Sequence, residues 1–344
     1  MMNSTARIAL IVGGDGQIGR AVARDLLLHG WLVRLARRSA RPPPADLVGR
    51  VETVQLDRDR PGALAAALNG GADAVIDTIA FTDAHARQWL ELDADIDALA
   101  VISSVSIYCD TAGRTMDEAQ GNGFPQFPIP ITEDQITVAP GPETYPTRKA
   151  AVEQTLLQNA RCPVIVLRPG AVHGEGSRHP REWWFIKRIL DGRRRIPLAY
   201  DGQSRFHTSG TSNIAALCRI AMEQPATHIL NIVDPEALTT AEIGRAIAAV
   251  YGVDLDLVPL PGPPVHGVGE HPWCIPSPMI MDMTRAHALG YRPVATYRDT
   301  IADVCRSAEA AAKAGVKFPD YLASGFNYSA EDTALARASK SYLL

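Results

Sequence analysis

Cysteine and long apolar segments are both scarce in this sequence of 344 residues. The five cysteines are odd in number and far apart, and no two of them form a Cys-x-x-Cys pair. This usage indicates neither a disulfide framework nor a zinc site. No apolar run reaches transmembrane length, and the first predicted strand leaves no room for a signal peptide before it. We therefore expect a cytoplasmic protein with no membrane partner.

A strong excess of one charge is absent as well. The formal net charge is only −4, whereas a nucleic-acid-binding protein usually carries a basic surface, so we expect no nucleic-acid partner. The sequence also has no Gly-x-Ser-x-Gly motif, which excludes the nucleophile elbow of an α/β-hydrolase. With 46% apolar and 21% charged residues, the composition is that of an ordinary globular protein.

The first thirty residues contain the most informative pattern. An apolar segment of strand length, residues 7–12, is followed by Gly13, Gly16 and Gly19 and then by a helical pattern ending at Gly30. In such an elbow the first glycine permits the sharp turn, the second lets backbone N–H groups approach a pyrophosphate, and the third lets the helix pack on the strand. The phosphates bind at the positive helix N-terminus. This segment predicts a dinucleotide site.

Strands and helices alternate after this unit, which predicts a parallel sheet built by right-handed crossovers. We expect an α/β fold with a Rossmann-type doubly wound sheet and a smaller C-terminal substrate-binding lobe. Residues 1–170, plus about 205–235, would form the dinucleotide-binding domain. Residues 171–204 and 236–344 would form the lobe, with the substrate between the two. The irregular segment 109–144 is interpreted as a lid, and the last twenty or so residues as a loosely packed tail.

The end of the second predicted strand decides which dinucleotide fits. An acidic residue there bonds the ribose 2′-OH of NAD, whereas an arginine accommodates the 2′-phosphate of NADP. Here Arg37 and Arg38 follow Ala36, which favours NADP(H) and leaves NAD(H) possible; the alternative is two surface arginines at a loop. Asp57, at the end of the third strand, would bond the adenine amino group or cap the following helix.

A second group of residues predicts the catalytic site. Tyr145 and Lys149 are four residues apart on a predicted helix, so they face the same way. A lysine ammonium favours the phenolate of a nearby tyrosine and makes it a usable acid and base near neutral pH. Ser104 ends the preceding strand, where its hydroxyl could hold a substrate oxygen. All three residues would lie at the carboxyl edge of the sheet.

With these motifs the sequence resembles the extended short-chain dehydrogenase/reductase superfamily, the group that includes nucleotide-sugar epimerases and dehydratases. Further residues that carry the resemblance are 103–108, 130–134, Arg168-Pro169 and 282–291. The resemblance implies that Tyr145 is the catalytic acid and base, that Lys149 bonds the nicotinamide ribose, and that Ser104 orients the substrate. It also implies a homodimer. The predicted cofactor contacts are Gly13, Gly16, Gln17, Ile18, Gly19, Arg37, Arg38, Asp57, Thr78, Ala80, Ser103, Lys149 and Pro169.

Departures from the family pattern bear on the substrate. Val105 and Ser106 occupy the positions where sugar dehydratases carry an acidic pair, so elimination of water is not expected. His173 stands where a tyrosine is common. Arg205 resembles the arginine that binds the diphosphate of nucleotide sugars, but the spacing after it is one residue longer and an acidic partner is missing. Ser106, His173 and Arg205 are the predicted substrate contacts, and no metal site is predicted.

Three functions follow from this interpretation. The first is an NAD(P)(H)-dependent oxidoreductase that interconverts a secondary alcohol and a ketone on a sugar-like or polyhydroxylated small molecule. The second is a redox-neutral nucleotide-sugar epimerase that keeps NAD tightly bound. The third is a dinucleotide-sensing protein without turnover, which would have no need for an activated tyrosine.

Overall fold

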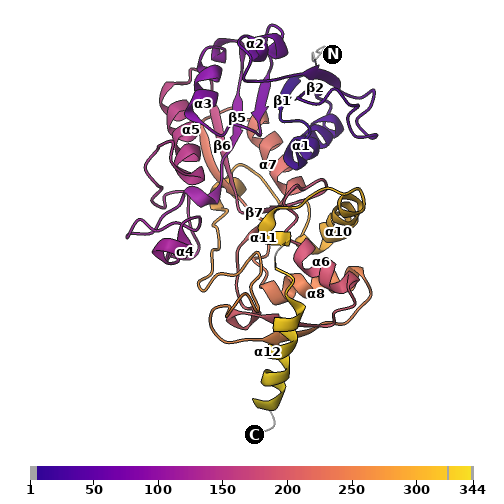
Figure 1. Ribbon diagram of the computed structural model, residues 1–344. Coiled ribbons are helices and arrows are strands. Elements are labelled where there is room, and N and C mark those ends of the chain that lie inside the picture. Colours follow the sequence, from indigo (N-terminus) through magenta and orange to yellow (C-terminus); the bar gives the residue numbers. More distant parts are fainter. Residues whose placement is uncertain (1–5, 324, 342–344) are drawn as a thin grey trace. The chain divides into compact units, whose positions relative to one another are not determined.

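The computed structural model describes residues 6–323 and 325–341 (Figure 1). The chain forms two compact units, each assembled from segments that are separated in the sequence. Unit 1 contains the described residues up to Val172, together with Thr211–Val233 and Met281–Val294. Unit 2 contains His173–Gly210, Asp234–Ile280 and the described residues from Ala295 onward.

Unit 1 is built on a sheet of seven parallel strands, the Rossmann-type arrangement predicted from the sequence. Its strands lie in the order β10 (His228–Ile232), β6 (Val164–Pro169), β5 (Leu99–Ile102), β4 (Ala74–Asp77), β1 (Ile8–Val12), β2 (Leu32–Arg37) and β3 (Glu52–Gln55). From β1 the chain builds outward to β2 and β3, and then returns to place β4 on the other side of β1. Ligands of such sheets bind at the carboxyl ends of the strands beside this reversal.

Both faces of the sheet are buried. One face packs against α1 (Gln17–Leu28) and α7 (Thr211–Glu223), and the other against α2 (Ala63–Leu68), α3 (Asp83–Leu90) and α5 (Tyr145–Asn159) (Figure 1). Successive residues of β1 supply the two cores: Ala9 and Ile11 join the first, and Leu10 and Val12 the second. Such two-sided burial explains the continuous apolar run of this strand.

A buried polar network joins the later strands of unit 1. Arg168 on β6 makes a double ion pair with Glu153 on α5, with Nη2 2.6 Å from Oε2, and its Nη1 donates to the Tyr108 hydroxyl at 3.1 Å. Tyr108 in turn donates to Asn231 Oδ1 on β10, and the Asn231 backbone N–H donates to the Glu133 carboxylate. Burial raises the pKa of Tyr108 to about 12, so its hydroxyl stays protonated as a donor.

The second half of the irregular segment 109–144 is held by hydrogen bonds to other parts of unit 1. The only helix of this segment among the described residues is the single turn α4 (Ala119–Asn122), after the 3₁₀ turn η2 (Val105–Ile107). The backbone of Cys109 bonds to that of Ile136, and the buried Ile131 accepts bonds from Asn231 and Asp282. Movement as a lid would thus be confined to the residues before about 129, and the lid itself stays a prediction.

Unit 2 contains mostly helices. Its elements are α6 (Trp183–Leu190), β8 (Arg195–Leu198), η3 (Tyr200–Gly202), β9 (Thr208–Gly210), α8 (Thr240–Val250), β11 (Asp256–Pro259), α10 (Tyr297–Lys313), α11 (Asp320–Ala323) and α12 (Tyr328–Ser341). Strands β8 and β11 pair in parallel. A capping box starts α8, because Thr239 and Glu242 exchange side-chain and backbone bonds. The remaining elements are η1 (Asp93–Asp95), β7 (Ala171–His173) and α9 (Thr284–Ala288).

Three expectations from the sequence need correction. Residues 281–294 belong to unit 1 rather than to the lobe, because the Asn231 side chain bonds the Asp282 carbonyl and the Asn213 side chain accepts from Val294 N–H. Residues 328–341 are not a loose tail, since they form α12, whose buried Glu331 pairs with Arg188; residues 342–344 lie outside the described residues. The helical pattern that begins at Asp83 predicts a helix to about Asp97, but α3 ends at Leu90 and the 3₁₀ turn η1 (Asp93–Asp95) follows it.

Candidate functional site

The glycine elbow has the geometry expected of a phosphate-binding turn. Gly13 has a φ of +91°, and both its N–H and that of Gly14 donate to the Ala36 carbonyl at the end of β2. A Cβ on Gly13 would lie 2.2 Å from Thr78 Oγ1, and one on Gly19 would lie 2.6 Å from the Gly13 carbonyl oxygen. Both positions therefore require glycine, and the predicted contact Thr78 supports the turn by donating to the Val12 carbonyl.

The start of α1 fits a diphosphate. Gly16 is the N-cap in an extended conformation, and no side chain of the described residues caps the helix. Gln17 Oε1 is buried without a hydrogen-bond partner in that part of the chain, which is the kind of orphaned polar atom that a bound group can satisfy. Ile18 packs against the core and holds this first turn on the sheet. The uncapped N–H groups and the positive helix end suit a dinucleotide's phosphates.

The two arginines after β2 differ in their surroundings. Arg37 is buried and pairs with Asp15 in the glycine elbow, with Nε 2.7 Å from Oδ1, and it also donates to the Arg41 carbonyl. Arg38 is exposed. Of the two, only Arg38 therefore presents an uncommitted position for a 2′-phosphate, whereas Arg37 ties the elbow to the loop after β2.

The predicted adenine contact Asp57 is exposed after β3. Its carboxylate accepts from the Asp59 N–H at 3.4 Å, and α2 begins only after Gly62, so the alternative role as a cap of that helix is wrong. The residue that follows is better anchored: Arg58 pairs with the buried Asp77 of β4 and donates to the Ile79 carbonyl. Asp57 is therefore next to a residue that is anchored at the carboxyl edge of the sheet. Its contact with adenine stays a prediction.

Helix α5 brings the predicted catalytic pair together. Thr144 caps the helix, Pro146 lies in the first turn, and Tyr145 is the first helical residue, 37% exposed. Lys149 follows one turn later and is buried; its Nζ donates to the carbonyls of Ala80 at 2.8 Å and Ile102 at 2.7 Å. These carbonyls follow β4 and end β5, so the carboxyl edge of the sheet itself fixes the ammonium, which lies 5.9 Å from the centre of the Tyr145 ring.

The serines after β5 complete this edge. Ser104 Oγ accepts from the Ser106 backbone N–H at 3.1 Å, which leaves its own hydrogen available for a substrate oxygen. Ser103 is buried, its backbone N–H donates to Leu167, and its hydroxyl lacks a partner among the described residues. Pro169 is the buried last residue of β6, beside β5 in the sheet. The predicted residues Tyr145, Lys149, Ser103, Ser104 and Pro169 therefore all belong to unit 1, at or next to this edge.

The buried lysine leads to a testable prediction. Burial lowers the pKa of Lys149 to about 8, because the charged form loses its hydration, although Asp77 and Glu153 partly compensate. The ordinary lysine pKa is about 10.4, so the unfolded chain binds more protons between these values and this group makes stability rise with pH across that window. Labelling the ε-carbons of the five lysines for NMR should reveal one signal that titrates near pH 8.

That signal should disappear in the Lys149→Met variant, while the other four lysine signals remain. If all signals of the wild-type protein titrate together near the ordinary value, the ammonium is hydrated and the burial described above is incorrect.

The predicted substrate contacts lie in both units. Ser106 is in unit 1, partly buried, whereas His173 and Arg205 are in unit 2. His173 is almost fully buried: its Nε2 lies 2.7 Å from Asp234 Oδ2, and this carboxylate raises the pKa of the imidazole. Arg205 donates to the Ala237 carbonyl and lies 3.8 Å from Glu242, so it has the acidic neighbour that its local sequence lacked. Their substrate roles stay predictions.

Several supporting residues were missed in the sequence. Asp15 pairs with Arg37 and Asp234 with His173. Because both partners are far away in the chain, the sequence does not reveal these roles. Phe81 covers Lys149 with its ring centre 4.5 Å from Nζ, and no periodicity marked it. Thr144 could have been found, because a threonine three residues before another hydroxyl residue and next to Pro146 is a plausible helix cap.

Membrane-spanning helices and metal-binding clusters are both absent from the described part of the chain. In the range 6–341 without residue 324, each helix is too short or too polar to cross a bilayer. The same residues contain no cluster of three or more histidine, cysteine or acidic side chains suited to a metal ion.

Comparisons with known proteins bear on the family and the fold of the chain. A model of the NAD dependent epimerase/dehydratase family matches residues 9–232. A 2′-dehydrokanamycin reductase from Streptomyces kanamyceticus is 31% identical over 172 residues, which are 49% of this chain and 44% of the reductase. A 3-diazoavenalumate denitrifying reductase from a Streptomyces species is 26% identical over 250 residues, covering 68% of this chain and 78% of that protein.

Among solved structures, a UDP-glucuronic acid 4-epimerase from Bacillus cereus in complex with NAD superposes with a TM-score of 0.66 at 17% identity, covering 89% of this chain and 98% of the epimerase. At this identity the likeness bears on the fold alone. The match to the first reductase spans less than half of that protein's length. The family model, however, covers more than half of the chain. The chain therefore belongs to the NAD dependent epimerase/dehydratase family and is an enzyme of the extended short-chain dehydrogenase/reductase type.

Proposed function

We propose that this enzyme uses a nicotinamide dinucleotide to interconvert a secondary alcohol and a ketone on a sugar-like, polyhydroxylated small molecule. One observation carries the proposal. Lys149 is buried with its ammonium bonded to the ends of β4 and β5, one helical turn from the exposed Tyr145. A buried cation next to an accessible phenol has little structural value, but it is what proton transfer by tyrosine requires.

The residues have distinct roles in this proposal. Tyr145 donates its hydroxyl proton to the carbonyl oxygen during reduction and takes it back during oxidation. The positive charge of Lys149 favours the phenolate that is left after donation. The Ser104 hydroxyl donates a hydrogen bond to the same substrate oxygen and orients the carbon. The dinucleotide, when bound, supplies or accepts the hydride.

The curated relatives favour net reduction, because both are reductases by name. The alternative function is a redox-neutral epimerase with tightly held NAD, and the match to the NAD dependent epimerase/dehydratase family supports it. A sensor without turnover is the third candidate, and the bonded Lys149 argues against it. On the basis of the sequence, we also propose that the protein is a cytoplasmic homodimer.

The test separates these candidates by following the hydride. The purified protein is first freed of any nucleotide, which is identified, and is then given NADPH or NADH deuterated at C4 with a panel of keto sugars. We expect deuterium at the new carbinol carbon of the product and net oxidation of the cofactor. Stoichiometric NAD that cannot be removed, with epimerised sugar and no net oxidation, would overturn net reduction in favour of epimerisation. Binding without any conversion would support the sensor.

For the cofactor, we propose a preference for NADP(H), which rests on Arg38. Arg38 directly follows β2 and is exposed, whereas Arg37 is held by Asp15. The Arg38→Ala variant is expected to bind NADPH roughly tenfold more weakly, about 1.4 kcal/mol, and to bind NADH as before. Fluorescence titration with both cofactors measures this change.

Arg50→Ala provides the matched control, since Arg50 is an exposed arginine of the same unit beyond the loop that follows β2. A wild-type protein that binds NADH more tightly than NADPH would refute the preference, and would point to Asp15 as the group that meets the ribose.

A further inference from the structure

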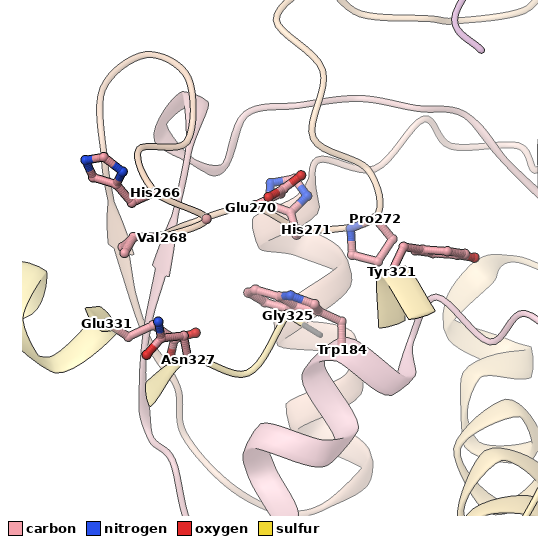
Figure 2. Close-up of a pocket in the computed structure, with 11 residues that line it drawn as sticks. Trp184, His266, Val268, Glu270, His271, Pro272, Tyr321, Gly325, Asn327 and Glu331 are labelled. Atoms are coloured by element: carbon pink, nitrogen blue, oxygen red, sulfur yellow. The ribbon is translucent and has the colours of Figure 1, made fainter. Parts of the chain in front are cut away.

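Unit 2 contains a cavity of about 340 Å³ with no part in the chemistry described so far. Its walls come from Trp184 on α6, the loop 266–272, and the segment from α11 to the first turn of α12 (Figure 2). Ligand pockets range from about 300 to 1,000 Å³, so this cavity suits a small ligand of about one ring. All of its lining residues belong to unit 2.

Buried polar groups without partners line this cavity. His271 is only 5% exposed, and neither of its ring nitrogens has a hydrogen-bond partner among the described residues. Trp184 Nε1 and Glu331 Oε2 are likewise buried and unpartnered within that part of the chain. In Figure 2 these side chains surround one space, with His271 and Glu270 opposite Trp184. An unpaired buried polar group costs about 1–3 kcal/mol, so three at one cavity indicate a missing ligand.

The hydrogen-bonding capacity of the walls is mixed. Burial and the nearby Arg188 lower the pKa of His271 to about 3, so its imidazole is neutral, with one nitrogen that donates and one that accepts. The Trp184 indole can only donate, and the Glu331 oxygen can only accept. Hydroxyl groups, which both donate and accept, satisfy such a set, whereas an apolar ligand would leave it unpaired.

The charge of the walls is negative. Glu270 is exposed at the rim, and Glu331 presents its second oxygen to the cavity. Arg188 bonds to the first oxygen of Glu331 and to the Gly325 carbonyl, and its guanidinium lies 3.5 Å from the centre of the Trp184 ring. Arg188 is not one of the lining residues, and its charge is offset by Glu331, so the exposed Glu270 carboxylate sets the charge at the rim and favours a protonated amine over an anion.

We propose that this cavity binds a small amine-bearing, polyhydroxylated molecule about one sugar ring in size. Its ammonium group lies between the carboxylates of Glu270 and Glu331, and its hydroxyls meet His271 and Trp184. The inference goes beyond the proposed function, because it uses only unit 2 residues and requires neither the dinucleotide nor turnover.

The test is calorimetric titration of the full-length enzyme with glucosamine, glucose and glucose 6-phosphate at about pH 6.5, where the amine is protonated. We expect glucosamine to bind most tightly, glucose more weakly, and glucose 6-phosphate not at all. Glu270→Gln should weaken glucosamine binding roughly tenfold and leave glucose within about twofold, as expected for the loss of one charge-assisted bond. The surface variant Glu236→Gln, in the same unit, is the matched control.

A second variant tests the cavity itself. A methyl group on Gly325 would lie 3.5 Å from Trp184 Nε1, an ordinary contact that the fold can accept, and would cover the indole N–H. Gly325→Ala should therefore weaken both glucosamine and glucose. Tighter binding of the phosphate ester, no binding of glucosamine to the wild-type enzyme, or equal binding by wild-type and both variants would each overturn the proposal. None of these results depends on catalysis, so an inactive enzyme can still pass the test.

Discussion

The Tyr145→Phe variant is expected to lose turnover by about 10²–10⁴-fold while binding the dinucleotide as tightly as the wild-type enzyme. Phenylalanine keeps the ring that lies 5.9 Å from the Lys149 ammonium and removes the hydroxyl group that carries the proton in the proposed reaction. Because the side chain is partly exposed at the start of α5, the fold should tolerate the change. The measurement is single-turnover reduction of a substrate found in the deuteride assay, alongside titration with the cofactor.

Tyr328→Phe serves as the control for this variant, since it also removes one hydroxyl, in that case a bond to Asp191 on unit 2. Its turnover should be that of the wild-type enzyme. If Tyr145→Phe keeps its full rate, the proton comes from another group and the proposed role of Tyr145 is wrong. If the variant keeps the full cellular function of the protein, and the purified wild-type protein converts no substrate, the sensor interpretation is the better one.

The Arg168→Met variant is expected to lower the free energy of unfolding by about 3–5 kcal/mol, because it breaks a buried ion pair on one side only. Glu153 would be left without its cation at 4% exposure, and the Tyr108 hydroxyl would lose one of its partners. Urea unfolding measures the change through the transition midpoint, with fluorescence and circular dichroism compared to check that the transition is two-state.

The double variant Arg168→Met, Glu153→Leu provides the matching test. It removes both charges, so we expect it to regain most of the stability that the single variant loses. A single variant within about 1 kcal/mol of wild type would mean that water reaches this ion pair and that the network contributes little to the stability of unit 1.

The elements of this fold that the sequence predicted are local ones. The three glycines at spacing three predict the elbow because each one answers a backbone requirement within a few residues. Tyr145 and Lys149 are paired by the helical repeat alone, and the strand runs of unit 1 are apolar because both faces of the sheet are covered. These features need no knowledge of distant contacts.

The parts that could not be predicted depend on distant partners. By sequence position Arg37 and Arg38 are equal candidates for a cofactor contact, and only the bond between Arg37 and Asp15 distinguishes the two. His173 gives no sign of Asp234, 61 residues later. Helix α12 has a polar sequence typical of a tail, and its anchor is a glutamate that is buried only because Arg188 is there to pair with it.

The way the chain is divided between its units has a consequence for synthesis. The chain changes unit five times, and unit 1 receives its last segment, Met281–Val294, long after its first strands. The Asn231 side chain finds one of its acceptors, the Asp282 carbonyl, only in that segment. During translation, this edge of the sheet therefore stays incomplete until Met281–Val294 has been synthesised. Contacts this far apart in the chain also slow folding. We expect fragments that end before Met281 to aggregate, so the protein should be produced as an intact chain.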